Sequence, residues 1–340
     1  MPRILPKLWF PAAVIAVALL AAACGSSGDD SPSQTGIVTT PIDSRYLPVV
    51  ISEDLAVGKQ RFQVGLIDQQ DGNTPVNGAK LHFKFYLLNA DGHTATAKFD
   101  IDPTAVTITK SYTHTHEDGT VETHQAGETG AYITYVNFDT AGFWGVEVTG
   151  TLADGTSIIA DGQEPVRPYF EVSEKSYGLA VGDPAPASTQ TVIADVSDIR
   201  SIDTSQTPIP EEHNMTVAQA ITSGKPTVIA FATPAFCVSQ LCGPTKEIFD
   251  GLYDKYKGQA NFLHIEPYDV DKVRAGECTN LGDCVVQAMY DFKLSGEPWV
   301  FIIDAQGKIA AKYDGIVSEA EMEQGLQAVL GQTPAATAIY

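Results

Sequence analysis

Two cysteines, Cys237 and Cys242, have a spacing that suits redox chemistry. Four residues separate them, and one helical turn could bring such a pair within bonding reach. A thiolate attacks a disulfide, and a second thiol nearby can resolve the mixed intermediate. The sequence therefore predicts a working dithiol, with a purely structural disulfide as the alternative.

The segments beside this pair must place it between a strand and a helix. Residues 226–232 are a continuous apolar run, typical of a strand that is covered on both faces. After the cysteines, Ile248, Leu252 and Tyr256 recur every four residues, which indicates an amphipathic helix. Either the first turn of this helix begins near Leu241, or the helix begins at Cys237 and is kinked by a proline.

Strands and helices alternate from residue 215 to residue 331. The pattern predicts strands at 261–266, 299–303 and 309–313, and helices at 217–221, 285–292 and from Ser318 onward. Glu321 follows Ser318 by three residues, which is the spacing of a helix-capping box. The C-terminal region is therefore expected to be an α/β domain.

This order of elements resembles the thioredoxin fold, and residues 231–237 and 297–301 carry the likeness. The family places its nucleophilic cysteine at a helix N-terminus, where free N–H groups stabilise a thiolate. It also places a cis-proline opposite that cysteine. The resemblance implies that Cys237 is the nucleophile, Cys242 the resolving thiol and Pro298 the cis-proline. Thioredoxins have two residues between their cysteines, whereas this chain has four.

Two other families have a similar cysteine pair, and a resemblance to them would imply other functions. Q-type peroxiredoxins have the same four-residue gap, and Thr233-Pro234 is similar to their Thr-Pro pair, although no arginine lies nearby in sequence. The copper-delivery members of the thioredoxin superfamily also use a cysteine pair, together with a downstream histidine. A peroxidase, or a non-enzymatic metal-handling or binding lipoprotein, is therefore the alternative to a thiol–disulfide oxidoreductase.

Proton transfer would need a base beside the thiols. Thioredoxins bury a carboxylate beneath the active site, and the matching residues here, Ile229 and Ala230, are apolar. His264 and Glu266 on the neighbouring strand could serve as general bases. The alternative is that both are surface groups or satisfied core groups.

The other cysteines divide by position. With Cys24 set apart in the N-terminal segment, the short separations favour a second pair, Cys278 with Cys284. We expect that pair to be a structural disulfide in a loop, with a second, electron-relaying dithiol as the alternative.

Three of the seven histidines, His114, His116 and His124, lie close together in sequence. A three-residue turn ending at Gly119 would put them and Glu122 on one face of a hairpin, whereas a two-residue turn would put His124 on the other face. The first arrangement would suit a Cu or Zn ion. The alternative is a solvated hairpin.

The residues before the α/β region have a different pattern. Alternating apolar residues with Asp-Gly and Asn-Gly turns predict about seven short strands in residues 45–173, which suggests an all-β, immunoglobulin-like sandwich. Residues 174–214 are expected to be a linker, and residues 332–340 a C-terminal tail.

The N-terminal segment predicts export. Basic residues and then an apolar run occupy residues 1–23, as in a secretory signal, and the segment resembles a bacterial lipobox that ends at Cys24. Ala21 stands where leucine is commonest in that motif. We expect lipidation at Cys24, a flexible tether over residues 24–44 and anchoring to the outer side of a cell membrane.

The charge narrows the range of partners. The formal net charge is -21, which argues against nucleic acid because its binders neutralise phosphates. The expected partners are protein thiols and disulfides, or an electron-donor redox protein, beside the membrane itself.

Overall fold

The structure is a computed structural model that describes residues 34–36, 44–90, 94–116 and 118–332. All of these described residues belong to one compact unit, residues 34–340. The expected signal peptide (1–23), lipidated Cys24, most of the tether and nearly all of the tail lie outside the described residues. Within them, no helix is both long enough and apolar enough to cross a membrane.

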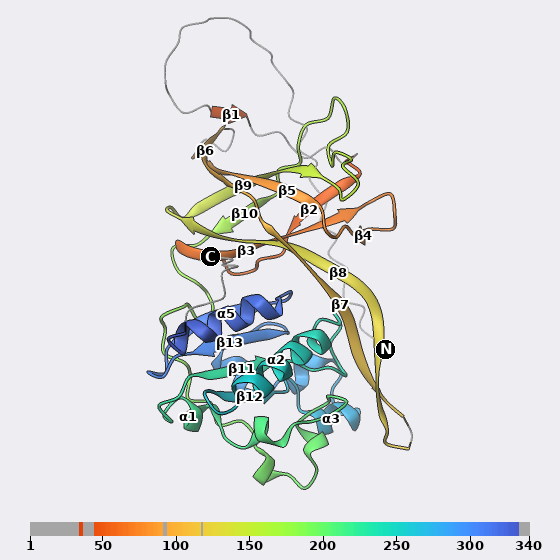
Figure 1. Cartoon of the computed structure of the whole chain (residues 1–340), viewed down its shortest axis with the longest axis vertical. Coiled ribbons are helices and arrows are strands. Elements are labelled where there is room, and N and C mark those ends of the chain that lie inside the picture. Colours follow the sequence, from red (N-terminus) through yellow and green to blue (C-terminus); the bar gives the residue numbers. More distant parts are fainter. Residues whose placement is uncertain (1–33, 37–43, 91–93, 117, 333–340) are drawn as a thin grey trace, which may run out of the picture. The chain divides into compact units, whose positions relative to one another are not determined.

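Two antiparallel sheets form the N-terminal region (Figure 1). One has the order β2-β3-β8-β7, and β4 pairs with β3. Its strands are β2 (Tyr46–Val50), β3 (Gly58–Asp68), β4 (Thr74–Pro75), β7 (Thr104–Thr115) and β8 (Val121–Phe138). The other has the order β1-β6-β5-β9-β10. Its strands are β1 (Gln34–Gly36), β5 (Lys80–Leu88), β6 (Thr94–Ile101), β9 (Gly142–Thr151) and β10 (Tyr169–Val172).

One aromatic-rich core joins these two sheets. Alternate residues of each strand point inward, as the period-two pattern predicts. Phe62 on β3 contacts Phe83 and Phe85 on β5, and Phe138 on β8 contacts Trp144 on β9. All five side chains are fully buried, so the sheets are held mainly by burial of large apolar surfaces.

A mixed sheet forms the centre of the C-terminal region. Its order is β12-β11-β13-β14, with β11 parallel to β12 and antiparallel to β13. The strands are β11 (Thr227–Phe231), β12 (Asn261–Ile265), β13 (Trp299–Ile303) and β14 (Ile309–Asp314). The coarser expectation, an all-β region followed by a region of alternating strands and helices, is thus confirmed.

Helices cover both faces of the mixed sheet. α2 (Cys242–Tyr256) and α5 (Glu319–Val329) pack on one face, over Val228 and Ala230. α1 (Val217–Ala220) and α4 (Gln287–Asp291) pack on the other face, over Ile229 and Phe231. This double cover is why β11 is buried at every position and apolar from Val228 to Phe231. A short helix, α3 (Val270–Arg274), follows β12.

Two segments differ from expectation. α4 is shorter than the helix expected at 285–292, because Val285 pairs with Tyr268 and Val286 bonds to Pro267 in extended conformation. The segment expected to be a linker contains three short 3-10 helices, η1 (Ile193–Asp195), η2 (Ile199–Ser201) and η3 (Pro210–His213). A fourth, η4 (Leu281–Cys284), precedes α4.

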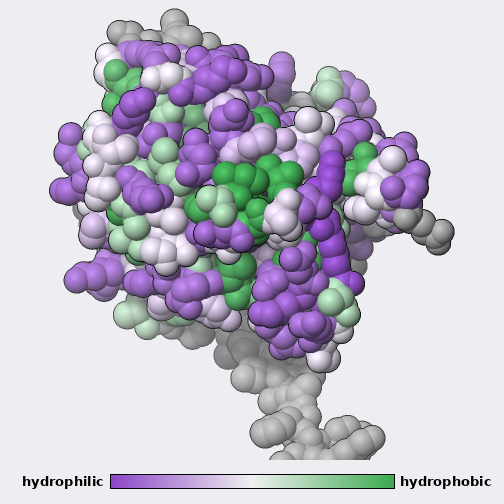
Figure 2. Space-filling view, turned by 90° about the horizontal axis from the view of Figure 1, so that it is seen from below, coloured by the Kyte–Doolittle hydropathy of each residue, from purple (hydrophilic) through white to green (hydrophobic). Residues whose placement is uncertain are grey.

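The sheet that contains β8 is covered on both faces. Tyr132 and Val136 face the aromatic core, whereas Ala131 and Ile133 pack against Ile316 of the C-terminal region. This explains why four successive residues of β8 are buried, which a half-exposed strand would not show. Elsewhere the surface is mainly hydrophilic with local hydrophobic areas, as Figure 2 shows for one face.

Candidate active site

Cys237 lies in the turn between β11 and α2, and α2 begins at Cys242. The Cys237 backbone N–H bonds to the Thr233 carbonyl at 3.1 Å, which closes the turn before the helix. Of the two possible helix starts, the structure has the one that follows Cys237. Pro244 falls in the first turn of α2, where a missing N–H breaks no helical hydrogen bond.

Two donors surround the Cys237 sulfur. The backbone N–H of Cys242 points to it at 3.4 Å, and the Ser239 hydroxyl lies 3.2 Å away. Both thiols are free and buried, and their sulfurs lie within 4.8 Å of each other. The first residue of α2, Cys242, therefore donates its free backbone N–H to the Cys237 sulfur, and its own side chain is the second thiol.

The two thiols have opposite pKa shifts. The hydrogen bond with Cys242 lowers the pKa of the Cys237 thiol from 9.0 to about 6; burial opposes this shift, and the Ser239 hydroxyl adds to it. Burial raises the pKa of the Cys242 thiol well above its usual range, and the neighbouring Cys237 raises it further. At neutral pH, Cys237 is therefore the thiolate and Cys242 the thiol, which is the division that nucleophilic attack and resolution require.

Glu297 and Pro298 lie beside the two sulfurs. Their peptide bond is cis, and Pro298 directly precedes β13, whose Trp299 pairs with Phe231 at the end of β11. A Glu297 carboxylate oxygen lies within 4.8 Å of both sulfurs, and its other contact is a hydrogen bond from Tyr268 at 2.7 Å. Burial raises the pKa of the Glu297 carboxyl, Tyr268 lowers it and the negative Cys237 raises it.

His264 and Glu266 are buried beside the redox turn, but they bond to groups other than the thiols. His264 Nε2 donates to the Ala232 carbonyl at 2.9 Å, and its Nδ1 lies 3.3 Å from Asp203. Glu266 accepts the backbone N–H of Thr204 at 2.7 Å. The group that the structure brings to the sulfurs is Glu297, which stands out in sequence only as the neighbour of Pro298.

The N-terminal sheets contribute directly to this site. On β7, Ser111 N–H bonds to the Gln240 carbonyl at 3.2 Å, and Thr113 N–H bonds to the Pro234 carbonyl at 3.1 Å. Both carbonyls belong to the turn that carries Cys237. A strand of the β region therefore holds the redox turn through backbone hydrogen bonds, a relationship that no local sequence signal reveals.

A cavity of about 550 Å³ borders the turn. Ser239, Leu241, Glu297 and Pro298 line it on the C-terminal side. Strands of the β region close the other side, including Val49 on β2. Val238, in the middle of the turn, is 87% exposed. The thiols are thus shielded, while the groups around them face a space that a ligand or a chain segment could enter.

The remaining cysteines and histidines lie elsewhere. Cys278 and Cys284 form a disulfide in the loop before α4. In the hairpin, His114 pairs with Glu122, Tyr112 pairs with His124, and His116 bonds across to Thr120. Gly119 has a positive φ of 84°. This is the register that puts the three histidines and Glu122 on one face.

That face is exposed at its tip. His116 Nε2 lies 3.1 Å from Glu122 Oε2, and the ring centroids of His114 and His116 are 5.1 Å apart. His124 stacks at a tilt beside Tyr112, with centroids 5.3 Å apart. The ligand atoms do not gather as closely as those of two other groups among the described residues, the cysteine pair with Glu297 and a buried histidine cluster.

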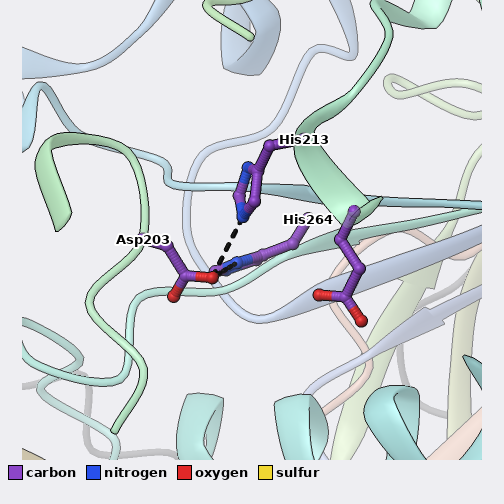
Figure 3. A group of neighbouring side chains, drawn as sticks. Asp203, His213 and His264 are labelled. Atoms are coloured by element: carbon purple, nitrogen blue, oxygen red, sulfur yellow. Dashed lines mark hydrogen bonds and ion pairs between the residues drawn. The ribbon is translucent and has the colours of Figure 1, made fainter. Parts of the chain in front are cut away.

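That buried cluster consists of Asp203, Glu212, His213 and His264. Figure 3 shows His213 and His264 pointing toward Asp203. Three of its members lie in the segments around η3 that sequence patterns assign to a linker, so spacing along the chain gives no signal for it. Only the fold brings these segments beside β12.

Comparisons with known proteins identify no family. No family model matches the chain, and no curated protein matches it. Among solved structures, the crystal structure of MtrC from Shewanella baltica OS185 aligns over 78% of this chain and 51% of that chain, with 10% identity and a TM-score of 0.22. The chain thus spans about half the length of that protein, and so low a score supports no argument about fold or function.

Proposed function

We propose that this chain is a thiol–disulfide oxidoreductase with a thioredoxin-like C-terminal domain and an immunoglobulin-like β region. The observation that carries the proposal is the pair of thiols with opposite pKa shifts at the start of α2. The fold supports it, since a strand order of β12-β11-β13-β14 with helices on both faces is what a thioredoxin-like domain would have. Two antiparallel sheets around one core suit a sandwich.

The reaction would proceed in two exchanges. The Cys237 thiolate attacks one sulfur of a substrate disulfide, forms a mixed disulfide and expels the other substrate sulfur as a thiolate. Cys242 then loses its proton and attacks the Cys237 sulfur. The second substrate thiolate leaves, and a Cys237–Cys242 disulfide remains. Two electrons have passed to the substrate, and the same steps in reverse would oxidise a dithiol.

The resolving step needs a proton acceptor, because Cys242 has the raised pKa. Glu297 is positioned for this task, since its carboxylate lies within 4.8 Å of the Cys242 sulfur. Burial raises its pKa, and a carboxylate with a raised pKa is a stronger base. His264 and Glu266 remain candidates only for a longer relay, because their hydrogen bonds lead to Ala232 and Thr204.

The substrate would be a protein disulfide that enters the cavity beside Pro298. The cavity volume of about 550 Å³ suits a short extended segment, and walls from both regions would bind it. The exported location and the lipid anchor at Cys24 are proposed on the sequence pattern alone. Release of the chain from the membrane fraction by Cys24→Ser would support the anchor, and unchanged membrane association would contradict it.

A parallel assay tests the main function. The full chain and its Cys237→Ser and Cys242→Ser variants are given a protein disulfide, such as insulin, or hydrogen peroxide. An oxidoreductase reduces insulin with an added dithiol, and Cys242→Ser accumulates a mixed disulfide on Cys237. Rapid peroxide consumption with a Cys237 sulfenate, and no insulin reduction, would instead support a peroxidase. Failure in both assays would contradict the redox function.

A further inference from the structure

Four ligand-type side chains meet in the interior, away from the thiols. Asp203, Glu212, His213 and His264 are all buried, and each offers an atom within 4.8 Å of the atoms of the others. They come from the loop after η2, from η3 and from β12. Ionisable groups are rarely fully buried without a partner that compensates their desolvation. A convergence of four of them therefore needs an explanation.

The distances in the cluster match those of a metal site. His213 Nε2 lies 3.0 Å and His264 Nδ1 lies 3.3 Å from the same atom, Asp203 Oδ2 (Figure 3). Ligands about 2.0–2.1 Å from a tetrahedral zinc ion are roughly 3.3 Å apart. The two nitrogen–oxygen distances therefore fit two edges of such a tetrahedron, and the two imidazole nitrogens lie within 4.8 Å of each other.

The outer contacts fix these ligand atoms in place. His264 Nε2 donates to the Ala232 carbonyl at 2.9 Å, which leaves Nδ1 as the nitrogen that faces Asp203. Asp203 Oδ1 accepts the Ser205 N–H at 2.7 Å, which leaves Oδ2 for the two imidazoles. Metal-binding histidines in proteins almost always have such a second partner on the other ring nitrogen.

Two atoms of this cluster are poorly satisfied. Glu212 Oε1 is buried without a hydrogen-bond partner among the described residues, and His264 Nδ1 has only its 3.3 Å contact with Asp203 Oδ2. Lys246 Nζ lies 2.8 Å from Glu212 Oε2 and also contacts Asp250, so Lys246 has a second carboxylate available. Glu212 can therefore turn to a cation without leaving Lys246 unpaired. A cavity of about 370 Å³ borders both histidines and offers a route of entry.

We propose that Asp203, His213 and His264, with Glu212 as the fourth ligand, bind a divalent transition metal ion of the zinc type. Mixed imidazole and carboxylate ligands suit Zn²⁺ and its neighbours better than Ca²⁺ or Mg²⁺, which prefer oxygen ligands only. With all four protein ligands in place the site is closed, which is the arrangement of a structural rather than a catalytic ion.

A metal ion at this site would stabilise the turn that contains Cys237 through the neighbouring residue Thr204. Thr204, next to Asp203, accepts the Ala235 N–H through its hydroxyl at 3.1 Å, and its carbonyl accepts the Thr113 hydroxyl at 2.9 Å. A metal bound at Asp203 would thus stabilise the loop that joins the turn to β7. The proposal does not depend on the redox function, since the ligands and the thiols are separate groups.

Metal binding is tested on a full-length variant without the two other groups of side chains that could bind a metal ion, the cysteine pair and the hairpin histidines. The background variant has Cys237→Ser and Cys242→Ser together with His114→Ala, His116→Ala and His124→Ala. We expect one equivalent of Zn²⁺ by calorimetry, and Co²⁺ should give the visible bands of tetrahedral coordination without a thiolate charge-transfer band. Adding His213→Gln should weaken binding more than about 100-fold, since even loss of an outer-shell partner costs 10–100-fold.

His82→Gln is the matched control, because His82 also contacts carboxylates, Asp100 and Asp102, but lies on the surface. It should leave the affinity unchanged. If His213→Gln does not fold, X-ray absorption of the zinc-loaded background variant decides, with only nitrogen and oxygen neighbours at about 2.0–2.1 Å expected. Absence of stoichiometric binding in the background variant, or sulfur neighbours around the bound zinc, would overturn the proposal.

Discussion

Ser111 on β7 donates its backbone N–H to the carbonyl of Gln240 at 3.2 Å, so a strand of the β region is bonded to the turn between the two cysteines. Gly243 makes this approach possible. A Cβ at Gly243 would lie 2.3 Å from the Ser111 hydroxyl and 2.8 Å from the Ser111 carbonyl. The start of α2 and β7 thus touch at backbone distance.

Gly243→Ala should therefore destabilise the protein by about 1–3 kcal/mol, because the added methyl group overpacks this contact. Denaturant unfolding measures the loss. Gly251→Ala is the matched control in the same helix, since a Cβ there meets nothing within 4 Å. In that control the free energy of unfolding should rise by roughly 0.5–1 kcal/mol, because alanine has a higher helix propensity than glycine. Equal effects of the two substitutions would show that the contact with β7 is absent in solution.

Ser239→Ala should raise the pKa of Cys237. The Ser239 hydroxyl lies 3.2 Å from the sulfur and lowers the pKa of this thiol, which stands at about 6. Iodoacetamide reacts with the thiolate, so alkylation of Cys237 should rise with pH through about 6 and then level off. In Ser239→Ala the midpoint should move up by about one pH unit, which corresponds to about 1.4 kcal/mol.

Val238→Ala, in the same turn and 87% exposed, should leave that midpoint in place. The shift also affects stability. Because the thiol has a lower pKa in the folded state than in the unfolded chain, its contribution to the stability of the reduced protein is complete above about pH 9. It is lost as pH falls through about 6. An alkylation midpoint near 9 in the unmutated chain would contradict both statements.

Glu297→Gln should slow the resolving step by at least about tenfold, because general-base assistance contributes factors of this size or larger. The mixed disulfide on Cys237 should then accumulate, which acid quenching and mass spectrometry would detect. Glu277→Gln, an exposed substitution in the loop after α3, is the control and should not slow resolution. A Glu297→Gln variant that resolves at the normal rate would exclude Glu297 as the base.

Val49→Asp should weaken the reaction with protein disulfides. Val49 lines the cavity beside Pro298 and is 37% exposed. A charge in the wall should raise KM for a protein substrate by about tenfold, about the cost of one poorly solvated polar group. Reaction with oxidised glutathione, which is small, should change little. Val57→Asp, at the same 37% exposure but outside that lining, is the control. An equal loss of activity toward the protein disulfide and toward oxidised glutathione would show that the substitution acts on the thiols and not on substrate binding.

Arg61→Met should be strongly destabilising. Arg61 on β3 bonds to Glu321 at 2.6 Å and to the Ile316 carbonyl at 2.5 Å, and the Glu321 side chain is only 1% exposed. Removing the arginine would leave a buried carboxylate uncompensated, at a cost of about 3–5 kcal/mol. Arg45→Met breaks the pair with Asp68, in which Arg45 is half exposed, and should cost far less because solvent screens an exposed ion pair. Thermal unfolding compares the two.

Local sequence patterns predicted the strands and helices better than the contacts between them. The alternation at Phe83 and Phe85 predicts a strand, and the repeat of Ile248, Leu252 and Tyr256 predicts a helix, because each element buries one face. The Ser318 cap also follows from local chemistry, and its hydroxyl accepts the Glu321 N–H. The same helix shows the limit of local patterns, because Glu321 also pairs with Arg61 on β3, and no local pattern predicts that contact.

What sequence patterns missed depends on long-range contacts. Asp203 and His264 are 61 residues apart, and nothing local marks them as neighbours. The double burial of β8 was missed because alternation assumes one solvated face, whereas Ile133 packs on Ile316. Glu297 stands out in sequence only as the residue before Pro298, and its position beside the sulfurs depends on how β13 pairs with β11.

The packing of Ile133 and Ile316 has a practical consequence for dissecting this molecule. A fragment that begins at Met215 would lose β7, β8 and Arg61 together, and so would expose Ile316 while Glu321 kept its charge without its arginine. The complementary fragment would expose the apolar side chains of Ala131 and Ile133 on one face of its sheet, a surface that favours aggregation. Neither half is therefore a natural module to express alone, and assays on isolated halves would report on damaged proteins.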